Sequence, residues 1–104
     1  MNFLDINEEQ MIFAKVIGNV VSTHKDENLQ GMKLLLCKEV NHEGEPINTY
    51  HVAVDAVQAG ENDFVLLSYG SSARMTNYTR NAPIDAVVMA IIDNIQITDK
   101  VDEK

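Results

Sequence analysis

The sequence predicts an all-β fold: a small five-stranded barrel, similar to the oligonucleotide-binding fold, with a short helical turn before its last strand. Segments with period-two alternation, or with a high density of Val, Ile and Leu, recur along the chain as in β-strands. Gly, Pro, Asn and Asp gather between these segments, as expected of turns. A chain of 104 residues makes one domain with a modest core. Closing its five short strands into a barrel would remove the exposed sheet edges.

The first strand is expected over residues 12–21, and both of its faces are apolar. One face is expected to carry Ile12, Ala14, Val16, Gly18 and Val20. The other face carries Phe13, Ile17 and Val21, which indicates that another subunit covers part of it. Gly18 in mid-strand is typical of a β-bulge or of the bend of a small barrel.

Three further strands are separated by polar turns with Gly, Asn or Pro. The strands are expected at residues 32–40, at 50–57 and from Phe64 onward, and the turns at 24–31, 41–46 and 58–62.

The last apolar run, residues 87–97, has two interpretations. Ile84, Val88, Ile91 and Ile95 fit a helical stripe. The density of Val and Ile instead favours a fifth strand, preceded by one helical turn at 83–86 that begins with Pro83. We therefore expect a barrel domain at 11–97, a flexible N-terminal extension at 1–10 and a charged C-terminal tail at 98–104.

Composition bounds the function. Sixteen acidic and eight basic residues give a net charge of -8, which repels phosphate backbones, so we expect no nucleic acid and no membrane as partners. The single cysteine excludes a disulfide within the chain and is typical of a reducing cytoplasm. No apolar run reaches the roughly 20 residues of a spanning helix, and we expect no signal peptide.

No residue pattern predicts a catalytic, cofactor-binding or metal site. The three histidines, His24, His42 and His51, lack metal-ligand spacing, and each is expected to be solvated or locally hydrogen-bonded. Cys37 lies on a strand without an adjacent run of cations that would stabilise a thiolate, so it is expected to be a structural thiol.

Two aspartates interrupt apolar strands. Because a carboxylate in such a position faces solvent or is paired, Asp55 and Asp93 are expected to form ion pairs, with Arg74 or Arg80 as partners, in preference to acting as catalytic acids.

The fourth strand leads into a loop of small residues, Gly70, Ser71, Ser72 and Ala73, followed by Arg74. Gly70 tolerates a positive φ, and the guanidinium of Arg74 suits a carboxylate or carbonyl partner. The serines do not form a nucleophile elbow, because Arg74 stands where the second glycine of Gly-x-Ser-x-Gly belongs. We interpret this loop as a contact point.

Five stretches then match one family in order. They are residues 14–23 (AKVIGNVVST), 29–36 (LQGMKLLL), 52–55 with 59–60 (VAVD, AG), 65–67 with 70–74 (VLL, GSSAR) and 83–93 (PIDAVVMAIID). With them the chain resembles the EutN/CcmL family, the pentameric vertex proteins of bacterial microcompartment shells, from Met11 to about Ile97. Residues 1–10 precede the usual start of that family, and 75–82 is variable territory.

The resemblance implies a cytoplasmic structural protein, not an enzyme, without cofactors. It implies a barrel that assembles as a homopentamer and caps the corners of a polyhedral shell, with hexagonal shell proteins of the same microcompartment as partners. Five loops meeting at an axis require small residues, so Gly70, Ser71, Ser72 and Ala73 are expected to line or flank the central opening, and Arg74 to anchor the loop at a subunit interface.

The alternative is a small β-barrel module that binds a ligand or a nucleic acid. Such barrels need a cationic groove and aromatic platforms, whereas this chain has three tyrosines in separate segments and no basic cluster.

Overall fold

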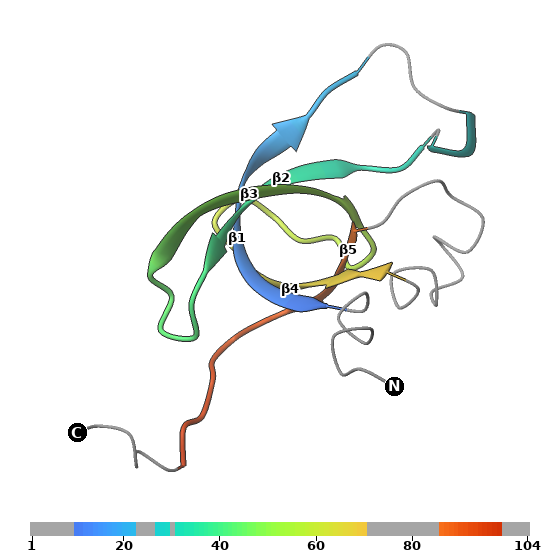
Figure 1. Cartoon of the computed structure of the whole chain (residues 1–104). Helices are drawn as coiled ribbons and strands as arrows, with labels where there is room; N and C mark the ends of the chain where they lie inside the picture. The colour runs from blue at the N-terminus through green and yellow to red at the C-terminus, as the bar shows by residue number, and fades with distance from the viewer. Residues whose placement is uncertain (1–9, 23–26, 30, 71–85, 99–104) are drawn as a thin grey trace, which may run out of the picture.

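The computed structural model describes residues 10–22, 27–29, 31–70 and 86–98. Its strands are β1 (Met11–Val20), β2 (Leu34–Val40), β3 (Pro46–Asp55), β4 (Phe64–Tyr69) and β5 (Ala86–Ile91), and a short 3-10 helix, η2, spans Glu27–Leu29. The strands form a closed barrel in the order β1-β2-β3-β5-β4 (Figure 1). The predicted all-β five-stranded barrel is confirmed.

The barrel closes through a short parallel seam. All other neighbouring strands are antiparallel, whereas β3 and β5 run parallel and pair only at Val54 with Val87 and at Asp55 with Val88. Over the rest of its length, β3 pairs with β2 alone among the described strands. Among the described residues, one long edge of β3 therefore has no pairing strand.

The core consists mostly of small and medium aliphatic side chains drawn from all five strands. Its buried members are Ala14, Val16, Leu35, Cys37, Ala53, Ala59, Val65, Leu67, Ala86 and Val88. A second, smaller cluster lies around buried Val54 and Val87, against which Leu29 of η2, Met32 and Met89 pack. Burial of this apolar surface is the main favourable term for folding.

A β-bulge in β1 moves the residues that follow it to the opposite face of the sheet. The register shifts between Val16 and Gly18, as predicted for this glycine. Val16 pairs with buried Cys37, but beyond the shift Gly18 pairs with Leu36 and Val20 with Leu34. Since one extra residue moves all later side chains to the opposite face, the expectation that Gly18 and Val20 share a face with Ala14 and Val16 is wrong.

The second turn is tighter than expected, so β3 begins at Pro46 and not at Tyr50. Oδ1 of Asn41 accepts hydrogen bonds from the backbone N–H groups of Glu43 (2.8 Å) and Glu45 (3.0 Å). Gly44 adopts φ +84°, and its N–H donates to the carbonyl of Asn41 at 2.9 Å. These bonds complete the turn within residues 41–45.

The last strand is shorter than predicted. β5 ends at Ile91, so the expectation of a strand to Ile97 is wrong for residues 92–97. The expected helical turn at 83–86 lies outside the described residues except for Ala86, which begins β5. The predicted extension and tail also lie outside them, apart from Gln10 and Thr98.

Candidate functional site

The loop singled out in the sequence begins directly after β4. Gly70 adopts φ +77°, the left-handed conformation predicted for it. Ser71, Ser72, Ala73 and Arg74 lie outside the described residues, so their roles stay predictions.

A partly buried polar network lies directly before this loop. The Tyr69 hydroxyl lies 2.5 Å from Nδ1 of His51, and Nε2 of His51 lies 2.9 Å from Oε1 of Glu39. The His51 and Tyr69 rings also meet edge to face, with centroids 5.5 Å apart. Three strands, β2, β3 and β4, are thus joined by one imidazole.

Both ring nitrogens of His51 have a partner in this network. Nδ1 is hydrogen-bonded to the Tyr69 hydroxyl, and Nε2–H donates to the Glu39 carboxylate. With both ring nitrogens bonded, neither is open as a metal ligand. These hydrogen bonds orient the three side chains and stabilise the sheet where β4 ends and the loop begins.

The expectation that His51 is solvated or locally hydrogen-bonded is wrong. The partners of His51 are 12 and 18 residues away along the chain. His51 shares the inward face of β3 with buried Ala53, and Glu39 lies two residues from buried Cys37. Each of these polar residues lies two positions from a buried residue of its strand and therefore on the same inward face. A polar residue at such a position needs a hydrogen-bond partner inside the fold, and this was the signal in the sequence for both residues.

Asp55 caps the turn that follows β3. Its carboxylate is buried, and Oδ1 accepts hydrogen bonds from the N–H groups of Val57 (3.0 Å) and Ala59 (3.1 Å). The arginines expected as ion-pair partners lie outside the described residues. Asp55 therefore has a structural role, as a backbone acceptor in the turn beside the parallel seam.

The lone thiol is inert at neutral pH. Cys37 is fully buried, and desolvation together with the nearby charge of Asp55 raises its pKa from 9.0 to about 11. The predicted structural thiol is consistent with this environment, since the thiolate is the reactive form.

Two of the remaining candidates, His42 and Asp93, face solvent. His42 and Glu43 are both exposed, with Nε2 and Oε2 3.7 Å apart, which makes a weak surface pair. Asp93 follows β5 and does not interrupt it, and it is exposed. His24 lies outside the described residues.

The described tyrosines do not form a base-stacking platform. Tyr50 is exposed on the outside of β3, where the Lys38 ammonium lies 5.0 Å from its ring centroid. Tyr69 instead bonds to His51 within the barrel. Because the two rings occupy different faces, the geometry does not favour a nucleic-acid module.

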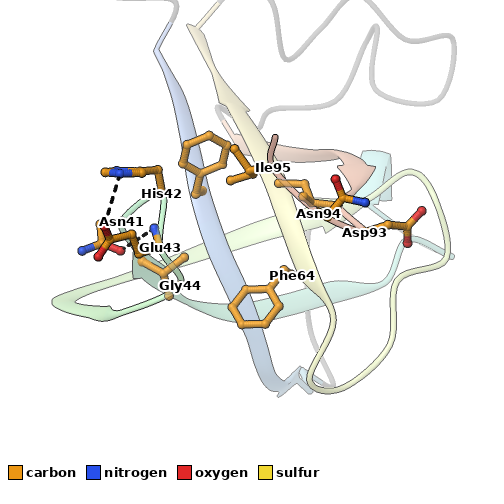
Figure 2. A pocket seen from close by; sticks show the side chains of 11 residues that line it. Asn41, His42, Glu43, Gly44, Phe64, Asp93, Asn94 and Ile95 are labelled. Atoms are coloured by element: carbon orange, nitrogen blue, oxygen red, sulfur yellow. Dashed lines mark hydrogen bonds and ion pairs between the residues drawn. The ribbon is translucent and has the colours of Figure 1, made fainter. Parts of the chain in front are cut away.

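A shallow groove of about 200 Å³ lies on the outside of the barrel (Figure 2). Its apolar lining comes from Phe13, Val40, Phe64, Ile92 and Ile95, and its polar rim from residues 41–44 with Asp93 and Asn94. Three strands (β1, β2 and β4), the second turn and the segment after β5 thus build one concave surface. It has room for an apolar side chain of a partner and lacks a catalytic constellation.

Further apolar side chains are exposed on the outer surface. On strands β1 and β3 they include Ile17, Ile47, Tyr50 and Val52. Tyr50 and Val52 are 53% and 49% exposed although they are strand residues beside a well-packed core. Ile47, Tyr50 and Val52 all belong to β3, so exposed apolar side chains gather on this strand.

The described part of the chain has neither a metal-binding cluster nor a membrane-spanning helix. It contains no group of three or more His, Cys, Asp or Glu side chains that could hold a metal ion. In the same residues, no helix is long and apolar enough to cross a membrane.

Residues 11–93 match the family model described as ethanolamine utilisation protein EutN/carboxysome. The chain is 46% identical over 87 residues to the carboxysome shell vertex protein CcmL of Synechocystis sp., covering 84% of this chain and 87% of that one. The structure of Nostoc sp. CcmL superposes with a TM-score of 0.80 at 47% identity (86% and 94% covered). The GrpN pentameric microcompartment shell protein from Rhodospirillum rubrum superposes with a TM-score of 0.75 at 40% identity (84% and 99% covered).

Proposed function

Because the chain belongs to the EutN/CcmL family, we propose that five copies of it form a ring that caps a vertex of a bacterial microcompartment shell, where the ring packs against hexagonal shell proteins. The protein is a structural shell component and not an enzyme. Flat sheets of hexagonal tiles cannot close, so a pentagonal unit supplies the curvature at each corner.

The observation that carries this proposal is the apolar outer surface. The barrel already has a complete core, yet Tyr50 and Val52 remain about half exposed beside it. A ring needs two different complementary surfaces on each subunit, because its contacts are head to tail. The outer face of β3 and the groove near Phe64 are two such apolar surfaces.

Native mass spectrometry tests the ring directly. Five subunits of 11.6 kDa give about 58 kDa, and a species of this mass is expected at micromolar concentration. Val52→Asp is expected to dissociate the ring, because it places a charge on an exposed apolar position of β3. The control Asn62→Asp adds the same charge at a turn residue with φ +73° and leaves the ring intact. A monomeric wild type would refute the proposal.

Capping is tested by electron microscopy of a hexagonal shell protein produced with and without this chain. Closed polyhedra are expected with it, and open sheets or tubes without it. Equal closure in both samples would refute the vertex role and leave the ring itself standing.

For the loop after β4, the proposal is that Gly70, Ser71, Ser72 and Ala73 flank the central opening and that Arg74 anchors the loop to a carboxylate. Arg74→Ala then weakens the ring by a few kcal/mol per subunit, because a partly buried carboxylate loses its charge-assisted bonds. Urea dissociation curves of the two proteins compare this directly. Identical curves would mean that Arg74 is a solvated charge.

A further inference from the structure

Residues 94–98 have the sequence pattern of a strand but pair with no strand among the described residues. Ile95 and Ile97 alternate with Gln96 and Thr98, a β-branched pattern that favours an extended chain. The two isoleucines are 41% and 49% exposed. In Figure 1 this stretch follows β5 and runs away from the barrel.

A second strand-forming element is incomplete on one side. β3 pairs with β2 along one edge, but along the other it meets β5 only at Val54 and Asp55. In an antiparallel pair every second residue turns its N–H and C=O groups away from the partner strand. The outer edge of residues 46–52 therefore presents unpaired backbone groups, at least within the described structure, and such an edge is a template for another strand.

Both segments lack the charges that normally protect open edges. Residues 46–52 (PINTYHV) and 94–98 (NIQIT) contain no Asp, Glu, Lys or Arg, although 23% of the chain is charged. Two copies of a protein with a net charge of -8 repel each other, and uncharged strands are where they can approach most closely.

Pairing within one subunit is disfavoured by the strand order. The N–H of Ile92 donates to the carbonyl of Phe64 in β4 at 2.8 Å, and Ile95 lines the groove with Phe13 of β1 and Phe64. The segment thus leaves along β4 and β1, whereas the open edge of β3 faces β5. It is directed away from the edge of its own subunit.

We propose that residues 94–98 of one subunit add as an edge strand to residues 46–52 of β3 in the next subunit. The inference rests on the proposed ring, in which each subunit gives one such segment and receives one, so that the contact closes after one turn. Ile47, Tyr50 and Val52 supply apolar side chains beside which Ile95 and Ile97 pack.

Amide hydrogen exchange on the assembled wild type tests the proposal. Alternate amides of 46–52 are expected to be protected, and truncation after Asn94 to raise their exchange rates on the order of tenfold or more. Truncation after Thr98, the matched control, leaves these rates unchanged. Unchanged rates in both truncations, with native mass spectrometry showing the ring, overturn the strand addition alone. Loss of the ring in the wild type overturns it together with the proposed function.

Disulfide trapping tests whether the contact joins two subunits. Ile97→Cys is combined in turn with Ile47→Cys, Tyr50→Cys and Val52→Cys, and oxidation is expected to yield covalent ladders in at least one pair. Ile97→Cys with Met11→Cys is the control, because Met11 is as exposed as Tyr50 (54% and 53%) but lies on β1. Bridges confined to single chains, or ladders only in the control, contradict the proposal. Buried Cys37 does not interfere.

Discussion

Replacing Asp55 with alanine tests whether one acceptor holds the turn beside the seam that closes the barrel. Oδ1 of Asp55 accepts from two backbone N–H groups, those of Val57 and Ala59, and Ala59 is itself buried. A buried donor left without a partner costs about 1–3 kcal/mol. Asp55→Ala is therefore expected to lower the free energy of unfolding by about 2–4 kcal/mol, a large part of the roughly 5–15 kcal/mol typical of a domain.

The matched variant is Asp55→Asn, which keeps an oxygen acceptor at the same position and removes the charge. Its loss is expected to be about 1 kcal/mol or less, because the neutral amide oxygen still accepts both bonds more weakly than the carboxylate. Urea unfolding followed by circular dichroism measures both variants on the assembled protein. Equal losses for alanine and asparagine would refute the reasoning, since the charge and not the acceptor would then be what matters.

Three further predictions follow from the buried groups and one from the charge. The folded state holds the Cys37 proton more tightly than the unfolded state, because the pKa of the thiol is raised from 9.0 to about 11. The stability that this proton contributes is fully present below pH 9 and is lost as the pH rises toward about 11. Between these pH values, the free energy of unfolding measured in urea should therefore fall less for Cys37→Ala than for the wild type. A double-mutant cycle of Tyr69→Phe and His51→Phe should show a coupling energy of about 0.5–1.5 kcal/mol, and additive losses would mean that their hydrogen bond contributes nothing. Ser68→Ala should raise the thermal midpoint, because the buried Ser68 hydroxyl has no hydrogen-bond partner among the described residues and leaving it so costs about 1–3 kcal/mol; a lower midpoint contradicts this. In a fluorescence titration at physiological salt, single-stranded DNA should not bind at sub-micromolar concentration, and binding would favour the nucleic-acid module.

The local pattern of the chain was enough to determine most strands and the kind of fold. Period-two alternation and turn residues place β1, β2 and β4 within a few residues of their observed bounds, because side-chain alternation is a property of each strand alone. The bulge at Gly18 was predictable for the same reason, since a mid-strand glycine is a local signal. The absence of reactive character in Cys37 also followed from its immediate neighbours.

Contacts between distant segments were decided only by the tertiary structure. The parallel pairing of β3 with β5 depends on how five strands close, and no alternation within either strand specifies it. The same closure ends β5 at Ile91 although Ile95 and Ile97 continue its pattern. The sequence by itself determines which residues favour a strand, whereas the partner and register of each strand depend on the whole barrel. For this reason the hydrogen bonds of His51 with Tyr69 and Glu39, which lie 18 and 12 residues away, are specified only by the tertiary structure.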